Sequence, residues 1–305
     1  MAADYSRTVE DVFLDAAIRS IAVHPCEYYR YLPLHPPRQA HTKQADRLTT
    51  LPSWAIDLTI TSQQIEPDGL YNDPIHLVRP FTSPIHRRTR EKGLVSLAYQ
   101  SDKSTLHTVG VRIGTIIETS RDILISPDAE PLASATVPAK ALYRLYNEMI
   151  QPRGIACDVF FCALFEARFG NSTILSEAFR SVVTGGAPAD QLLSLQNQVL
   201  PRMTDAAQNK ILFVTSGGHV GLTYHLDALD RVRAGDEVVR LFGDMIPFVL
   251  RRVRGEHERY VMVNVAFVPE HVSGWKWFEK APEGSTPEDV WRNSGAFRLK
   301  EYVIV

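Results

Sequence analysis

The sequence has few cysteines. Only three occur among its 305 residues, Cys26, Cys157 and Cys162, and no two of them have the C-x-x-C spacing of a metal site. An odd number of scattered cysteines argues against a disulfide framework, which proteins of oxidising compartments use. The composition therefore predicts a reducing, cytoplasmic location.

Long hydrophobic runs and an excess of one charge are also missing. The longest apolar stretch, VFFCALF at 159–165, is far shorter than the roughly 20 residues that cross a membrane as a helix. The formal net charge of -2 leaves no positive excess to attract a polyanion. Because 45% of the residues are hydrophobic, the chain should build a sizeable core. We predict a soluble protein with no membrane span and no nucleic-acid partner, whose oligomeric state the sequence does not specify.

Signatures of nucleophilic, phosphate-binding and metal-dependent catalysis are absent from the sequence. It contains no G-x-S-x-G, no Walker loop and no H-E-x-x-H. Its ten histidines are scattered, and none pairs with a carboxylate at the spacing of helical metal ligands. We therefore predict neither a metal nor a cofactor.

The sequence does contain alternating segments typical of strands and periodic segments typical of helices. Residues 8–22 predict a helix that Thr8 caps. Short strand-like runs fill 94–126, and helices are expected at 139–150, 156–170 and 187–200. The first of these helices places Met149 and Ile150 on its apolar stripe. Strands return at 210–215, 219–224, 236–242, 247–253, 259–268 and 297–305. This order predicts an α+β fold whose antiparallel strands form a barrel-like or sandwich core, with a helical insertion at about 138–200 and an N-terminal helix.

We expect one domain over 1–305. Its parts are an N-terminal helix and proline-rich strap at 1–48, a first strand region at 49–137, the helical insertion at 138–200 and a C-terminal strand region at 201–305.

One strand of the C-terminal region allows a prediction about its faces. In RYVMVNVAFV, which starts at Arg259, the residues Val261, Val263, Val265 and Phe267 alternate with others. These four apolar residues should face the same side of a half-buried strand.

The stretch TSGGHVGL, at 215–222, places two adjacent glycines between strand-like runs. No helix follows it, so it is not a dinucleotide fingerprint. Gly217 and Gly218 predict a two-residue hairpin turn, in which φ is positive.

Two further segments have a binding interpretation beside a plain structural one. HRRTREK, at 86–92, is either a solvated loop or a clamp for a ligand carboxylate through Arg87 and Arg88. Trp275 and Trp277 either pack in the core or form a stacking platform for an apolar ligand.

Several segments, taken in order, resemble a family pattern. LPSWAIDLT, at 51–59, resembles a Leu-Pro-Ser-Trp-x-x-Asp-Trp motif, and LFVTSGGHVGL, at 212–222, resembles a Thr-x-x-Gly-aromatic-x-Gly-Leu hairpin. GDEVVRLFGDMIPFVLRRV, at 235–253, resembles Gly-Asp-x-x-x-x-Leu-Phe-Gly followed by Pro-Phe-x-Leu-Arg. Over most of 5–275 the ordered set resembles the region that follows the HET domain in fungal heterokaryon-incompatibility (HET) proteins.

The chain departs from that pattern in two respects. The HET domain, which carries the death-signalling role of the family, does not occur in this sequence, so we do not expect cell-death activity. His219 stands where the hairpin usually has an aromatic residue, and the loop after Leu222 is longer. Divergence in loops on a retained framework is typical of a remodelled ligand pocket.

Stand-alone chains of this kind resemble accessory proteins of fungal natural-product pathways. The resemblance implies an intramolecular Diels–Alder cyclisation of an activated terpenoid, an apolar small molecule. Such a reaction needs a shaped pocket and a hydrogen-bond donor on the dienophile carbonyl, and no cofactor. The candidate catalytic residues are Tyr224 and His219. The candidates for substrate binding are Trp54, Arg87, Arg88, Tyr99, His225 and Trp275.

Two other classes of function stay open. One is a non-enzymatic regulatory or scaffold protein related to the HET proteins but lacking the effector domain. The other is a hydrolase, which requires a serine or cysteine within hydrogen-bond reach of a histidine. No spacing in the sequence indicates the latter.

Overall fold

The computed structural model describes the following residues, to which all structural statements apply: 7–23, 51–55, 99–102, 105–120, 144–157, 159–160, 163, 210–224, 232–241, 247–256, 258–268 and 299–305.

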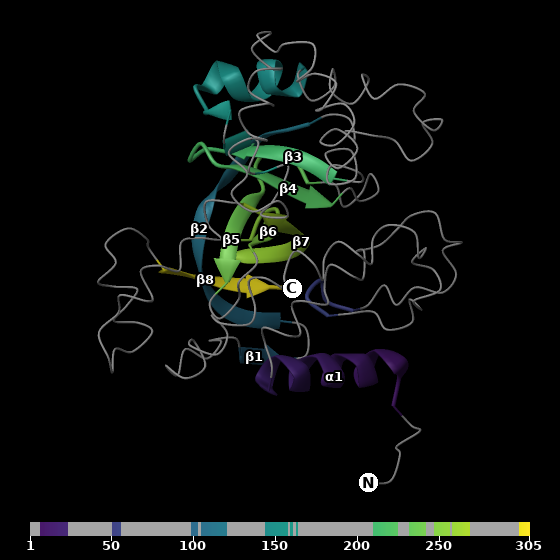
Figure 1. Cartoon of the computed structure of the whole chain (residues 1–305). Coiled ribbons are helices and arrows are strands. Elements are labelled where there is room, and N and C mark those ends of the chain that lie inside the picture. Colours follow the sequence, from purple (N-terminus) through teal and green to yellow (C-terminus); the bar gives the residue numbers. More distant parts are fainter. Residues whose placement is uncertain are drawn as a thin grey trace, which may run out of the picture.

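Helix α1 spans Val9–Val23 and confirms the helix expected at 8–22. Thr8 caps it, because the N–H of Asp11 donates to the Thr8 hydroxyl at 3.1 Å and that hydroxyl donates back to the Asp11 carboxylate at 3.0 Å. Leu14 and Ala17, three residues apart, are buried and form the face that packs against the strands. The helix lies at one end of the molecule (Figure 1).

Eight strands dominate the described residues. Their bounds are β1 Tyr99–Asp102, β2 Thr105–Thr119, β3 Lys210–Thr215, β4 Val220–Tyr224, β5 Glu237–Leu241, β6 Phe248–Arg252, β7 Arg259–Phe267 and β8 Leu299–Ile304. All pairings are antiparallel except that of β7 with β8, so the sheet is mixed. The expected sheet-rich α+β class is confirmed.

The helical insertion is described only in part. A π-helix at Tyr146–Ile150 occupies the end of the first helix expected there, and a 3₁₀ turn at Gln151–Arg153 follows it. Met149 and Ile150 are buried, as expected for that helix. The other two expected helices fall mostly or wholly outside the described residues, as does the strand-like run at 122–126.

Strand β2 is the element on which the other strands assemble. It is 15 residues long and pairs successively with β8, β5 and β3 as it runs away from α1 (Figure 1). Register shifts occur at Ile113 and at Ile117, each of which is an extra residue of the kind that bends a strand. Backbone pairing also forms a circuit, from β2 through β5, β6, β7 and β8 and back to β2.

Two clusters of buried side chains lie on opposite faces of these strands. On β5, Val238 belongs to one cluster and Val239 to the other, and on β6 Val249 and Leu250 divide in the same way. The first core comprises Leu14, Ala17, Trp54, Leu106, Val239, Leu241, Phe248, Leu250, Tyr260, Met262, Val265, Tyr302 and Ile304. The second core comprises Ile113, Ile116, Phe213, Val232, Val238, Val249, Val263, Ala266 and Val268.

The residues of β7 that were predicted to share one face lie in different surroundings. Val261 is 37% exposed, Val263 lies in the second core and Val265 lies in the first. A register shift in the pairing with β6 leaves one extra residue in β7, a β-bulge. One extra residue moves all following side chains to the opposite face. The prediction that these three valines and Phe267 share one face is therefore wrong.

Strands β3 and β4 form the predicted hairpin, but its loop is longer than predicted. The N–H of Gly218 donates to the Thr215 carbonyl at 3.0 Å, and the Thr215 N–H donates to the His219 carbonyl at 2.9 Å, which closes a three-residue loop. Only Gly218 has a positive φ, of 78°. A turn followed by one left-handed residue is the usual form of such a loop. The prediction of a two-residue turn with positive φ at Gly217 is wrong.

Gly221, in β4, is required by close packing. A Cβ atom there would lie 2.3 Å from Cζ of Phe213, a fully buried ring, and 2.7 Å from the carbonyl oxygen of Phe267.

We expect Gly221→Ala to lower the free energy of unfolding by about 1–3 kcal/mol through overpacking, measured by urea denaturation. Gly218→Asn is the control, because a Cβ there has open space and asparagine tolerates positive φ. Equal losses in the two variants would contradict this assignment.

Candidate functional site

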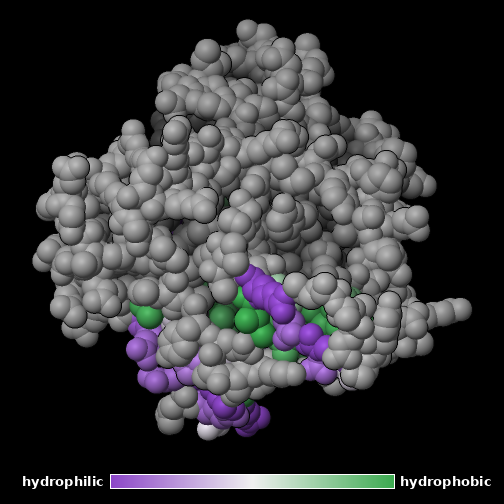
Figure 2. Space-filling model, turned by 90° about the horizontal axis from the view of Figure 1, so that it is seen from below, coloured by the Kyte–Doolittle hydropathy of each residue, from purple (hydrophilic) through white to green (hydrophobic). Residues whose placement is uncertain are grey.

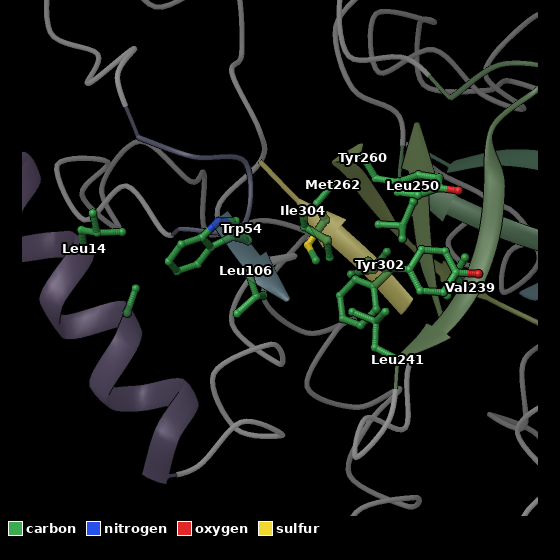
Figure 3. Close-up of a cluster of buried hydrophobic side chains, with 13 residues drawn as sticks. Leu14, Trp54, Leu106, Val239, Leu241, Leu250, Tyr260, Met262, Tyr302 and Ile304 are labelled. Atoms are coloured by element: carbon green, nitrogen blue, oxygen red, sulfur yellow. The ribbon is translucent and has the colours of Figure 1, made fainter. Parts of the chain in front are cut away.

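Trp54, expected to line a substrate pocket, is fully buried in the first core. Figure 3 shows its ring between Leu14 of α1 on one side and Leu106 and Ile304 of the strands on the other. It therefore closes one end of the first core, where it joins the helix to the strands.

Ser53, the neighbour of Trp54, ties this segment to two strands. Its hydroxyl donates to the Val305 carbonyl and accepts a hydrogen bond from the Met262 N–H at 2.9 Å. Its N–H also donates to the Val305 carbonyl, at 3.2 Å. The Leu-Pro-Ser-Trp stretch thus extends the pairing of β7 and β8 beyond the end of β8. Its polar residue, Ser53, and its aromatic residue, Trp54, therefore both have structural roles.

The two candidate catalytic residues lie at opposite ends of β4. His219 precedes its first residue, and Tyr224 is its last. At about 3.3 Å per residue their Cα atoms are about 16 Å apart. His219 and Tyr224 are therefore too far apart to bind the same substrate carbonyl. The His219 ring lies over Gly217, where an added Cβ would meet its Cδ2 atom at 3.1 Å.

The other sequence candidates contribute nothing to a described site. Tyr99 begins β1 and pairs with His107 through the backbone. Arg87, Arg88, His225 and Trp275 lie outside the described residues. Their assignments stay predictions.

Asp236 and Arg251 form a buried ion pair that the family pattern contains. Nε and Nη2 of Arg251 lie 2.8 Å and 2.9 Å from the two carboxylate oxygens of Asp236, which is 2% exposed. The N–H of Arg233 donates to the same carboxylate at 3.0 Å. The pair joins the start of β5 to β6, so the Asp of Gly-Asp and the Arg of Pro-Phe-x-Leu-Arg have a structural role.

A second group of polar side chains lies at the end of the first core away from Trp54. We call it the polar cluster; its members are Glu237 of β5, Arg252 of β6, Tyr260 of β7, and Lys300 and Tyr302 of β8. In Figure 3 the hydroxyl oxygens of the two tyrosines point to the same side, away from Trp54 and Leu14. Four strands therefore bring ionisable groups to one end of an apolar core.

Tyr260 is the hub of the polar cluster. Its hydroxyl accepts hydrogen bonds from Lys300 Nζ and from Arg252 Nη2, the latter at 3.3 Å. It lies 3.4 Å from Oε1 of Glu237, to which it donates. Arg252 Nη2 is 3.2 Å and Lys300 Nζ 3.8 Å from the same carboxylate. Hydrogen bonds to Tyr260 and the charge of Glu237 raise the pKa of Arg252, so its guanidinium stays charged.

Tyr302 differs from Tyr260 in having no such partners. Its hydroxyl is buried and makes no hydrogen bond within the described part of the chain. Burial raises the pKa of Tyr302, and the negative charge of Glu237 raises it further, so the hydroxyl stays neutral and keeps its proton. The Tyr260 and Tyr302 rings meet edge to face at 5.1 Å, and Lys300 Nζ lies 5.0 Å from the Tyr302 ring centroid. The Tyr302 hydroxyl is thus a donor that no described residue accepts from, and it lies close to the cations of Lys300 and Arg252.

Sequence reasoning missed this cluster, although a weak signal was present. Lys300 and Tyr302 are two apart in a strand, so they share a face, and Glu237 begins a strand that is otherwise apolar except for Arg240. Their convergence depends on pairings between distant strands, which one sequence does not specify. Among the described residues, no three histidine, cysteine, aspartate or glutamate side chains gather as a metal site would require.

Comparison with known proteins leaves the family open: no protein-family model, curated protein or solved structure matches the chain. None of the described helices combines the length and the apolar character that a membrane crossing needs.

Proposed function

We propose that the protein is a cofactor-independent cyclase of fungal secondary metabolism, related to the region that follows the HET domain, which catalyses an intramolecular Diels–Alder reaction of an activated terpenoid. The observation that supports this proposal is the buried hydroxyl of Tyr302, which lies at the edge of an apolar core and has no hydrogen-bond partner among the described residues. A buried hydroxyl without a partner is costly to a folded protein, and a ligand carbonyl would satisfy it.

A barrel-like core is part of the same proposal. The circuit of pairings through β2, β5, β6, β7 and β8 supports it. Side chains fill the interior of a small barrel, so a ligand binds at its mouth. In this arrangement the first core is the filled interior, Trp54 closes one end, and the polar cluster lies at the mouth.

The proposed reaction needs only a hydrogen-bond donor and an apolar surface that orients the substrate. A Diels–Alder reaction forms its bonds in one step, and drawing electron density from the dienophile carbonyl lowers its barrier. The Tyr302 hydroxyl, which keeps its proton, supplies a neutral donor for that carbonyl. The apolar surroundings hold the chain folded with diene and dienophile in contact, which supplies most of the acceleration.

The test compares cyclisation rates of activated linear and macrocyclic terpenoid dienes with and without the protein. We expect Tyr302→Phe to slow the reaction by about 10- to 100-fold, the effect of one well-placed donor. Its free energy of unfolding should stay within about 0.5 kcal/mol of the unsubstituted protein or rise, since the lost hydroxyl makes no hydrogen bond within the part of the chain that the structure describes.

Tyr146→Phe, in the π-helix away from the polar cluster, is the matched control and should leave the rate unchanged. A protein-free rate equal to the rate with protein, across the panel, would refute the cyclase. An unchanged rate in Tyr302→Phe alone would remove this residue from the mechanism and leave Tyr224 and His219 as the candidates.

One observation favours the scaffold alternative. Val9 and Val12 of α1 are 50% and 45% exposed. Figure 2, seen from the side of α1, shows hydrophobic atoms exposed among hydrophilic ones. Val9 and Val12 are three residues apart in α1 and so lie side by side on its surface, and contiguous apolar surface of this kind occurs at protein interfaces. The scaffold is therefore the function we infer if no diene is cyclised.

A further inference from the structure

We propose that the polar cluster is an anion-binding subsite that takes a carboxylate carried by an otherwise apolar ligand. The inference rests on the proposed function in one respect: the ligand is taken to be the substrate of the cyclase. It assigns substrate binding to Arg252 and Lys300.

Among the described residues, positive charge exceeds negative charge at this end of the core. Arg252 and Lys300 share the carboxylate of Glu237, which leaves one positive charge unbalanced within that part of the chain. Arg112 of β2 adds a third cation, whose charge opposes the rise in the pKa of Tyr302 and so acts at the same place. A ligand carboxylate would balance this excess.

Both cations are held in position instead of moving freely in solvent. Arg252 is fixed through Nη2, which contacts Glu237 and Tyr260, while the side chain remains 53% exposed. Lys300 is held by the Tyr260 hydroxyl and by the two tyrosine rings, 4.8 Å and 5.0 Å away. Donors fixed in advance lose less conformational entropy when they bind an anion. A guanidinium and an ammonium side by side suit the two oxygens of a carboxylate.

The surroundings restrict the kind of anion. Beneath the polar cluster lies the first core, whose nearest members include Leu250 and Val239. A small, fully hydrated anion would gain nothing from this apolar neighbour. An amphipathic acid would place its carboxylate on the cations and its hydrocarbon against the core.

The experiment measures binding of a terpenoid acid, geranylgeranoic acid, and of its methyl ester to the full chain by isothermal titration calorimetry. We expect the acid to bind at least about 10-fold more tightly than the ester, a difference of about 1.4 kcal/mol. Arg252→Gln and Lys300→Met should each remove most of that preference and leave ester affinity unchanged. Arg254→Gln, an exposed cation outside the polar cluster, is the matched control and should keep the preference.

Equal affinities for acid and ester, or no binding of the acid, would overturn the inference. A preference that survives both substitutions would also overturn it. A variant that merely unfolds would lose affinity for acid and ester alike. The measured quantity is therefore the ratio of the two affinities. The two proposals fail separately: a protein that prefers the acid but cyclises no diene keeps the subsite and loses the cyclase. A protein that cyclises neutral dienes without preferring the acid keeps the cyclase alone.

Discussion

Asp236→Ala should lower the free energy of unfolding by about 3–5 kcal/mol. The substitution leaves the Arg251 guanidinium, 19% exposed, without its carboxylate and also removes the acceptor of the Arg233 N–H. Removing one member of a buried pair is costly because the remaining charge stays desolvated. Urea denaturation followed by circular dichroism measures the loss.

Glu256→Ala is the matched control for this ion pair. Glu256 pairs with Arg259 at 3.0 Å, but both side chains are nearly half exposed, so its loss should cost less than about 1 kcal/mol. Combining Asp236→Leu with Arg251→Met should recover part of the loss, since both charges of the pair are then replaced by apolar side chains. Equal destabilisation by Asp236→Ala and Glu256→Ala would show that burial does not increase the contribution of the Asp236–Arg251 pair to stability.

The positions of the strands were more predictable than their faces and loops. Alternation alone located β3 through β8 to within one or two residues, because alternation depends only on neighbouring residues. It failed on β7, where a bulge reverses the faces, because the extra residue is defined only by the pairing with β6. It failed on the hairpin loop for a similar reason, since hydrogen bonds between Thr215 and His219 set the loop length.

The candidate site was predicted less well than the strands. Within the segments that carry the family resemblance, Trp54 and His219 received functional assignments, yet Trp54 and several of its motif neighbours have structural roles. Ser53 and Trp54 join α1 to the strands, Gly221 permits close packing, and Asp236 pairs with Arg251. The polar cluster carries no motif, because its members come from four strands that meet only after folding.

Trp54→Ala should cause a loss of about 3–5 kcal/mol in the free energy of unfolding, because it leaves a large cavity where α1 meets the strands. Trp54→Phe should cost less, since a ring remains between Leu14 and Ile304. Val12→Ala, on the exposed face of α1, is the control and should change stability by less than about 0.5 kcal/mol.

This substitution also separates the two roles considered for Trp54. A residue lining a substrate pocket would weaken ligand affinity in Trp54→Phe while leaving the urea midpoint unchanged. A core residue would lower the urea midpoint, and the affinity of the folded fraction would stay the same. Complete burial of the ring, at the end of the first core opposite the polar cluster, predicts the second outcome. A change in affinity at constant stability would instead place a ligand against α1 and move the proposed mouth to that end of the core.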